Sequence, residues 1–123
     1  MDDNQLDQLY ELNKPVQTSK DFLIRINDIY KRIRLEEIYY FSSEGKYVSI
    51  AGKDRKYSFR STLKHLDTIL PGNFTRIHTS HIINLDKITG VKVQDNSVLL
   101  SNGDELPFSR TYKDNIYMNF LVG

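Results

Sequence analysis

The run FTRIHTSHIINLDKI, residues 74–88, decides the fold of this 123-residue chain. Its first half alternates in character from Phe74 to Thr79, which predicts a strand. The polar pair Thr79–Ser80 then interrupts the strand, and an apolar run at Ile82–Ile83 resumes in a different phase. We therefore expect the side chains at the break to project from a corner of a sheet. They are donors and hydroxyls of the kind that bind phosphate oxygens and base edges, namely Arg76, His78, Thr79 and Ser80.

Outward from this run, short segments of period-two alternation predict a mainly β domain. Pairs such as Asn27–Asp28, Glu44–Gly45 and Asn102–Gly103 mark turns between them. The chain contains no βαβ alternation. The expected strands are Phe22–Ile26, Tyr30–Leu35, Ile38–Phe41, Tyr47–Ala51, Arg55–Arg60, Phe74–His78, Ile82–Asn84, Gly90–Gln94 and Ser97–Ser101.

Two short helices are expected within this pattern. The leucines and isoleucines of residues 63–70 recur three and four positions apart, which predicts an amphipathic helix. Ser61 or Thr62 is placed to cap it, and Pro71–Gly72 ends it. A series with four-residue spacing from Tyr112 to Phe120 predicts a final helix.

Length and composition bound the class of protein. A chain of 123 residues corresponds to about one domain and can bury a modest core without staples. It contains no cysteine, which excludes disulfides and thiolate metal sites and suits the cytoplasm. No apolar run approaches the ~18 residues of a membrane-spanning helix. The first residues, MDDNQLDQLY, are acidic and polar, unlike a secretory signal.

The first 21 residues differ from the rest of the chain. They predict a helix around Asn4–Leu12, which Asn13–Pro15 ends before a polar linker. Their net charge is −3, whereas the remainder carries +4. We therefore expect residues 1–21 to be a helix and linker, either a tether to another domain or a small decoration. Residues 22–123 are expected to form the folded domain.

Basic residues concentrate between Lys46 and Arg76. This stretch holds seven basic residues against Asp54 and Asp67. A locally basic face on a nearly neutral protein fits a phosphate footprint. The solvated polar face of a sheet would give the same pattern, so charge alone leaves both interpretations open.

Enzymatic and metal-binding patterns find little support. His78 and His81 are three residues apart, positions that face opposite sides of a strand, and no cysteine or convincing acidic neighbour completes a ligand shell. Ser80 lies near His78 but outside any Gly-x-Ser-x-Gly elbow, and the glycines are too scattered for a phosphate loop. We expect no catalytic site, metal, cofactor or small-molecule substrate. A small hydrolase using His78 and Ser80 is the weakest alternative.

Four pieces of sequence, spread over residues 22–117, form a combined pattern. They are IYYFSSEGKYV at 38–48, STLKHL from 61 running to Leu70–Pro71, Arg-x-His-x-Ser-x-x-x-Asn at 76–84, and Gly-x-x-x-Pro-x-Ser-Arg at 103–110. In this order they resemble the LytTR-type (LytR/AlgR) DNA-binding domain of bacterial response regulators. The resemblance implies an elongated, mainly β domain of small stacked antiparallel sheets, with one short internal helix and a C-terminal helix.

The resemblance also implies sequence-specific binding of double-stranded DNA, as the output domain of a two-component transcriptional regulator. Loops, not a recognition helix, would enter the grooves. The domain would bind as a pair on repeated half-sites, and a receiver domain would belong to the full-length protein. The alternative is a β-rich protein-interaction or RNA-binding module. Steeply salt-dependent binding to duplex DNA separates the two.

Three loops match the contact loops of the family and supply most candidate residues. The candidates for reading bases are Tyr47, Thr79, Arg110 and Thr111. The candidates for binding phosphates are Lys46, Lys56, Arg60, Arg76, His78, Ser80, Ser109 and Lys113. Thr111 stands where many members carry a second basic residue, which leaves open which side chain reads the base. Tyr47 could instead belong to the core, His78 could brace its loop, and Ser109 could simply cap the last helix.

Overall fold

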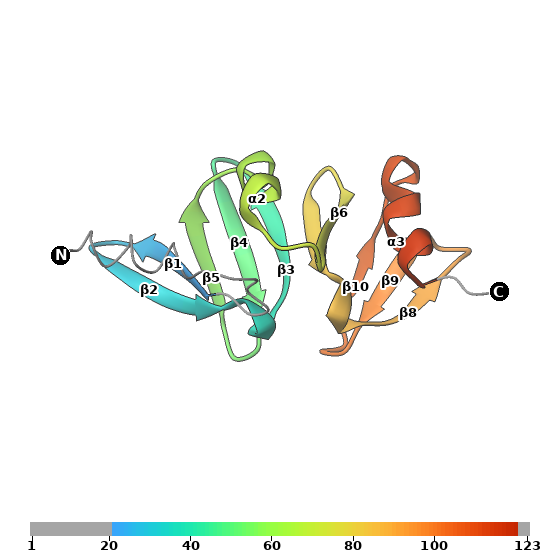
Figure 1. The fold of residues 1–123 in the computed structure, drawn as a ribbon, viewed down its shortest axis with the longest axis horizontal. Coiled ribbons are helices and arrows are strands. Elements are labelled where there is room, and N and C mark those ends of the chain that lie inside the picture. The colour runs from blue at the N-terminus through green and yellow to red at the C-terminus, as the bar shows by residue number, and fades with distance from the viewer. Residues whose placement is uncertain (1–20, 121–123) are drawn as a thin grey trace, which may run out of the picture.

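Three antiparallel sheets follow one another along the long axis of the molecule (Figure 1). The computed structural model describes residues 21–120, with side chains as far as Met118. The helix expected at Asn4–Leu12 lies outside these residues. Within them, the predicted fold class is confirmed: the domain is elongated and mainly β, with one short internal helix and one C-terminal helix.

The sheets are built from neighbouring hairpins. A two-stranded sheet, β1 (Asp21–Ile26) with β2 (Ile29–Arg34), forms one end, and its turn passes through Asn27 with a φ of 60°. A five-stranded sheet in the order β5-β4-β3-β7-β6 follows, and a three-stranded sheet in the order β10-β9-β8 forms the other end. The remaining strands are β3 (Ile38–Glu44), β4 (Tyr47–Gly52), β5 (Lys56–Arg60), β6 (Phe74–His78), β7 (His81–Asn84), β8 (Ile88–Lys92), β9 (Ser97–Leu100) and β10 (Glu105–Pro107).

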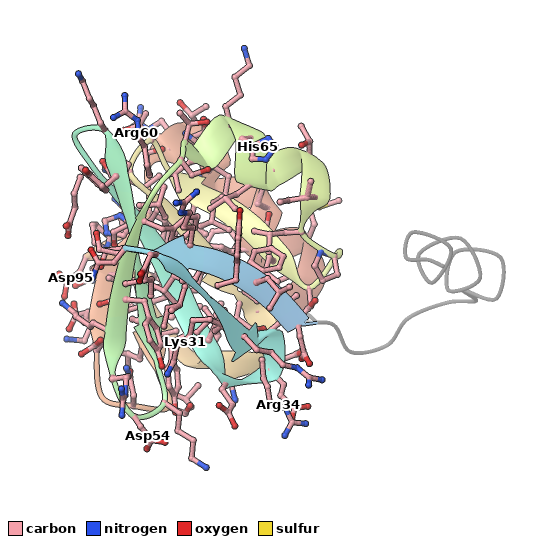
Figure 2. The ribbon with its side chains drawn as sticks, turned by 90° about the vertical axis from the view of Figure 1, so that its left-hand side faces the viewer. Lys31, Arg34, Asp54, Arg60, His65 and Asp95 are labelled. Atoms are coloured by element: carbon pink, nitrogen blue, oxygen red, sulfur yellow. The ribbon has the colours of Figure 1, made fainter. Side chains whose placement is uncertain are left out.

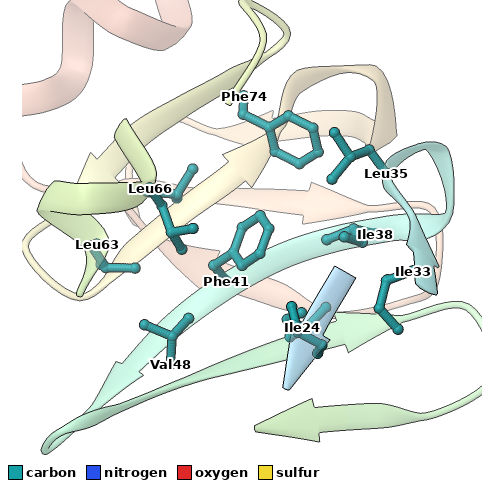
Figure 3. Packing of buried hydrophobic residues seen from close by; sticks show 11 residues of the cluster. Ile24, Ile33, Leu35, Ile38, Phe41, Val48, Leu63, Leu66 and Phe74 are labelled. Carbon is teal, nitrogen blue, oxygen red and sulfur yellow. The ribbon is translucent and has the colours of Figure 1, made fainter. Parts of the chain in front are cut away.

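Strand β7 lies between two hydrophobic cores, and each of its two faces is buried in one of them. Ile82 packs into the N-terminal core, whereas Ile83 packs into the C-terminal core. In the N-terminal core (Figure 3), the rings of Phe41 and Phe74 lie 5.7 Å apart between centroids. Each fully buried side chain of this size contributes about 1.5–3 kcal/mol. The C-terminal core consists of Ile77, Ile83, Leu85, Val98, Leu100, Leu106, Phe108 and Ile116.

A buried asparagine fixes the end of β7. Asn84 is 1% exposed, and its Nδ2 donates to the carbonyl of Ile38 at 2.9 Å. Its Oδ1 accepts the amide of Asp86 at 3.0 Å and the Nδ2 of Asn73 at 3.1 Å. Because a buried amide is costly unless it is paired, these bonds specify asparagine at this position. The chain then turns through the 3₁₀ segment Leu85–Lys87 into the third sheet.

The internal helix α2 (Leu63–Ile69) covers the N-terminal core. The hydroxyl of Thr62 accepts the amide of His65 at 3.0 Å, which confirms it as the N-cap. Ile69 was expected on the apolar face, but it is 46% exposed. The helix ends there, and Leu70, already in extended backbone, packs against the core instead. No helix of the described residues is long and apolar enough to cross a membrane.

The third sheet differs from the sequence prediction in two ways. The strand expected at Gly90–Gln94 begins two residues earlier, as β8 (Ile88–Lys92), because the preceding 3₁₀ segment brings Ile88 directly into register with Leu100. Strand β10 was not expected, although the turn at Asn102–Gly103 implies a returning strand. A strand of three residues that includes a proline shows too little alternation to be recognised.

Candidate nucleic-acid interface

Four segments that are far apart in the sequence meet at one edge of the domain, the upper edge in Figure 1. The amide of Ser43 donates to the carbonyl of Ser80 at 3.0 Å, which joins the β3–β4 turn to the β6–β7 turn. The amide of Ser109 donates to the carbonyl of Ile77 at 2.9 Å and brings the approach to the last helix beside β6. Pairing of β4 with β5 adds the end of β5. We call this edge the loop edge; it consists of residues 44–47, 60–64, 79–80 and 109–113.

The guanidinium of Arg76 holds the β6–β7 turn from within the protein. Its Nε donates to the carbonyl of His78 at 3.1 Å, and its Nη2 donates to the carbonyl of Thr79 at 3.0 Å. Its Nη1 pairs with Asp67 of α2 at 2.9 Å, and the group lies 5.9 Å from the ring centroid of Tyr112. The Arg76 side chain is only 22% exposed. All three guanidinium nitrogens therefore donate to protein oxygens.

His78 braces the same turn. Its Nδ1 accepts the amide of Ser80 at 3.1 Å and lies 3.4 Å from the hydroxyl of Thr79. Its ring packs edge-on against His81, with centroids 5.6 Å apart. The expectation that the two histidines face opposite sides of a strand is wrong, because Thr79–Ser80 is a two-residue turn and they pair directly across it. The bracing alternative for His78 fits this geometry.

His81 is partly buried at the end of the β6–β7 turn. Its ring centroid lies 6.1 Å from that of Tyr40, and its Nδ1 has no hydrogen-bond partner among the described residues. Burial, and after it the charge of His78, lower the pKa of His81. The folded turn therefore favours the neutral imidazole. Within residues 21–118 no cluster of three His, Cys, Asp or Glu side chains could hold a metal.

Among the described residues, no side-chain hydrogen bond or ion pair holds the β3–β4 turn, although Glu44 and Tyr47 pair across it. Gly45 has a φ of 65°, and a Cβ at this position would meet no atom within 4 Å. The next residue, Lys46, is exposed. Tyr47 is 48% exposed and belongs to neither core, so the core alternative for it is wrong. Arg60, directly opposite Tyr47 in the β4–β5 pairing, is also exposed.

The approach to the last helix supplies the remaining candidates. A 3₁₀ turn, Arg110–Tyr112, leads into α3 (Lys113–Phe120). The exposed residues here are Arg110, Thr111 and Lys113. The Ser109 hydroxyl makes no capping bond, so the capping alternative is wrong for this side chain. Its oxygen is buried without a hydrogen-bond partner among the described residues.

The basic stretch of the sequence is divided between the two ends of the five-stranded sheet. Lys56 begins β5 and Arg60 ends it, so the two lie at opposite ends. Lys53 and Arg55 share the end of Lys56, the lower end in Figure 2, where Asp54 is labelled. The structure brings together Lys46, Tyr47, Arg60, Arg76, His78, Thr79, Ser80, Ser109, Arg110, Thr111 and Lys113, and leaves Lys56 apart.

Four residues that were not among the candidates contribute to the loop edge. Lys64 is exposed on the first turn of α2 and belongs to the basic stretch, so its charge was a usable signal. Asp67 and Tyr112 hold the guanidinium of Arg76. Asn115 donates from Nδ2 to the carbonyl of Arg76 at 2.8 Å, across 39 residues of sequence. No sequence pattern links such distant partners.

Comparisons with known proteins concern the family and the fold of the chain. The family model of the LytTr DNA-binding domain matches residues 27–120. The chain is similar to the sensory transduction protein LytT of Enterococcus faecalis, with 35% identity over 81 residues; these are 63% of this chain and 34% of that protein. The chain thus spans about a third of the length of this relative. Its fold is similar to that of a LytTr DNA-binding domain from Bacillus cereus, with a TM-score of 0.68 and 20% identity over 84% of this chain and 96% of the other.

Proposed function

Because the chain belongs to the LytTr DNA-binding domain family, we propose that the loop edge is the surface through which it binds duplex DNA. The observation that carries this proposal is the convergence of four sequence segments on one edge. The exposed charged side chains there are five basic residues and a single acidic one, Glu44. Such an edge matches the negative charge of the DNA backbone. The basic residues are Lys46, Arg60, Lys64, Arg110 and Lys113.

The exposed side chains have different chemical uses. Lys46 and Arg60 present exposed cations that suit phosphates. Arg110 carries a planar fork that can donate to O6 and N7 of guanine in the major groove. Thr79 is short and sits on a braced turn, which permits close approach to a base edge, while Tyr47 can contact a thymine methyl. Thr111, Ser80 and Lys113 complete the proposed contacts.

Arg76 and His78 support this surface from behind. Nε and Nη2 of Arg76 and Nδ1 of His78 bond to the backbone of the β6–β7 turn, so these two residues fix the position of Thr79. A preformed turn reduces the conformational entropy lost on binding. We therefore assign these two residues to positioning and leave Lys56, at the far end of the sheet, outside the interface.

In its wider role, we propose that the domain is the DNA-binding output of a cytoplasmic bacterial response regulator. The similarity to LytT, named as a sensory transduction protein, supports this assignment. A receiver domain would belong to the full-length protein, and two copies would bind repeated half-sites. This role involves no catalysis and no cofactor. The alternative of a protein-interaction or RNA-binding module is not favoured by the family membership.

Selection of bound sequences from random duplex DNA, followed by salt titration, tests the function. If about five to eight phosphates are contacted, a fourfold rise in salt reduces affinity a hundredfold or more. A scrambled duplex should bind more weakly than the selected one at every salt concentration. Affinity that stays flat across this range would exclude duplex DNA as the ligand.

Arg110→Ala tests the assignment of base reading. We expect a loss of about 1–3 kcal/mol on the selected duplex and relaxed preference at one base position. Arg55→Ala is the matched control, since it removes an exposed arginine at the opposite end of the sheet. Equal losses for Arg110→Ala on the selected and the scrambled duplex would make Arg110 a backbone anchor, and base reading would then fall to Tyr47 or Thr79.

A further inference from the structure

An open hollow of about 440 Å³ lies between the turn of the β1–β2 hairpin and the strands β4 and β5. Two arginines from distant segments, Arg25 and Arg60, line it together. No acidic residue is among its lining residues. A second hollow, of about 390 Å³, is lined by two lysines and two glutamates, so its cations already have carboxylates beside them. Only the first hollow therefore offers unneutralised positive charge.

The β1–β2 hairpin orients the guanidinium of Arg25 but uses only one of its nitrogens as a hydrogen-bond donor. Its Nε donates to the carbonyl of Asn27 at 3.1 Å, and the group lies 6.0 Å from the ring centroid of Tyr30. No carboxylate pairs with Arg25 or with Arg60 among the described residues. The outer nitrogens of Arg25 thus keep donors for an external oxygen, in the fork geometry that suits phosphate.

The hollow adjoins the loop edge. Tyr47 and Arg60, which belong to that edge, also line the hollow. Figure 2 shows Arg60 at the upper end of this face and Arg34 at the lower end. Arg25 and Arg34 belong to the same hairpin, but Arg25 is near its turn and Arg34 is at its base. The lining also includes Ser58 and Phe59. A serine hydroxyl can donate to a phosphate oxygen, and an aromatic ring can pack against a sugar.

We propose that this hollow is an additional phosphate site that seats a backbone phosphodiester of the DNA flanking the bases read at the loop edge, with Arg25 and Arg60 as its two cations. This inference rests on the proposed function, and it extends the DNA-binding surface onto the β1–β2 hairpin. A contact of this kind is indifferent to sequence and depends on the length of the duplex. A free phosphate or nucleotide presents the same chemistry, so the test separates the two sources.

The test compares the full 123-residue chain with Arg25→Ala, Arg25→Lys and Arg34→Ala on two duplexes. One duplex ends at the selected site, and the other extends about one helical turn, ~10 base pairs, beyond it on each side. Arg34 is the control because it lies at the base of the same hairpin, where its side chain is 57% exposed and pairs with Glu36 at 2.9 Å. Circular dichroism confirms that each variant is folded.

On the long duplex, Arg25→Ala should lower the slope of log affinity against log salt by about 0.9, so that a fourfold salt rise costs ~3.5-fold less affinity than in wild type. Arg25→Lys should keep most of the wild-type slope, because it keeps the charge. Arg34→Ala should match wild type. On the short duplex, Arg25→Ala should also match wild type, because the flanking phosphate is absent.

Three outcomes would overturn the inference. Identical behaviour of Arg25→Ala and Arg34→Ala on the long duplex would remove the site, and an equal loss on the short duplex would place Arg25 elsewhere in the interface. Inorganic phosphate alone, titrated while the side-chain Nε–H signals of Arg25 and Arg60 are followed by NMR, should leave both unmoved at concentrations where DNA saturates them. Saturable shifts with free phosphate would assign the hollow to a small anion. Wild-type protein that bound neither duplex would instead contradict the proposed function itself.

Discussion

The two turns at the centre of the loop edge are held in opposite ways. The β6–β7 turn is fixed by Arg76, whose guanidinium donates to two carbonyls of the turn, and by His78, which accepts the amide of Ser80. Among the described residues, no side chain bonds to the β3–β4 turn: a Cβ at Gly45 would meet no atom within 4 Å, and Lys46 beside it is exposed. Each turn has one basic residue, but Arg76 faces the protein, whereas Lys46 faces solvent.

A basic residue beside a DNA-binding loop can therefore have one of two roles: it can hold the loop in shape, or it can contact the DNA. A guanidinium that is already bonded to backbone carbonyls, a carboxylate and an aromatic ring supports the shape of the surface. An exposed ammonium on a turn that no described side chain braces is free to contact a phosphate. The rigid turn therefore suits base reading by Thr79, and the adaptable turn suits the backbone.

Substitution of Arg76 tests the difference between the two turns most strongly. Arg76→Ala removes three charged hydrogen bonds and should lower the free energy of unfolding by about 1.5–3 kcal/mol. Urea denaturation measures this loss, and DNA titration should show weaker binding with reduced preference for the selected site. Arg76→Lys keeps the charge but cannot reach the same oxygens, so it should resemble Arg76→Ala. If Arg76→Lys binds like wild type and Arg76→Ala only flattens the salt slope, Arg76 is a phosphate ligand after all.

The adaptable turn depends on its glycine. Gly45→Ala places a Cβ at a φ of 65°, which should cost about 1–2 kcal/mol of stability through backbone strain alone, since nothing obstructs the new methyl group. Thermal unfolding of Gly45→Ala and Gly45→Asn provides the comparison, because asparagine tolerates this region better. Equal, undetectable losses in both variants would show that the turn relaxes to another conformation at no cost.

Lys46 and Lys56 form a matched pair for the adaptable side of the comparison. Lys46→Ala should reduce the salt slope by about 0.9 and weaken all duplexes alike, because it removes one phosphate contact. Lys56→Ala removes the same charge from the far end of β5 and should leave the slope unchanged. Fluorescence anisotropy across a salt series distinguishes them. A slope change for Lys56→Ala equal to that for Lys46→Ala would put the far end of the sheet on the DNA.

The smallest expected effect is a pH dependence that is specific to the braced turn. The folded state lowers the pKa of His81, so below the ordinary value of ~6.5 the unfolded chain binds more protons than the folded chain. Stability should therefore fall as pH drops from about 6.5 toward the lowered pKa of His81. His81→Gln should show a shallower decline in urea unfolding over the same range. An identical decline in wild type and His81→Gln would mean that His81 does not couple the turn to pH.

The sequence predicted the strands and helices of the loop edge better than the contacts that their side chains make. Alternation and turn residues correctly located β6, α2 and most hairpins, because these depend on neighbours in the chain. The resemblance also collected residues from distant segments, such as Lys46 and Arg110, that the structure does bring to one edge. The inward direction of Arg76 could not be predicted, since Asp67 and Tyr112 become its partners only in the folded domain.

Two differences between the sequence analysis and the structure have the same physical origin. His78 and His81 were expected on opposite faces because strand geometry was applied across a turn, where pairing places them side by side. Lys56 was grouped with Arg60 by proximity in sequence, although a strand of five residues carries them to opposite ends of the sheet. Local spacing predicts an element, but not which end of it meets a partner.

Amide chemical-shift mapping by NMR, with the selected duplex titrated into the wild-type protein, tests the proposed interface most directly. The perturbed signals should gather at Lys46–Tyr47, Thr79–Ser80 and Arg110–Lys113, while those of residues 53–56 at the opposite end of the sheet stay in place. Perturbations that cluster at residues 53–56, with the three loop-edge segments unmoved, would contradict the proposed interface.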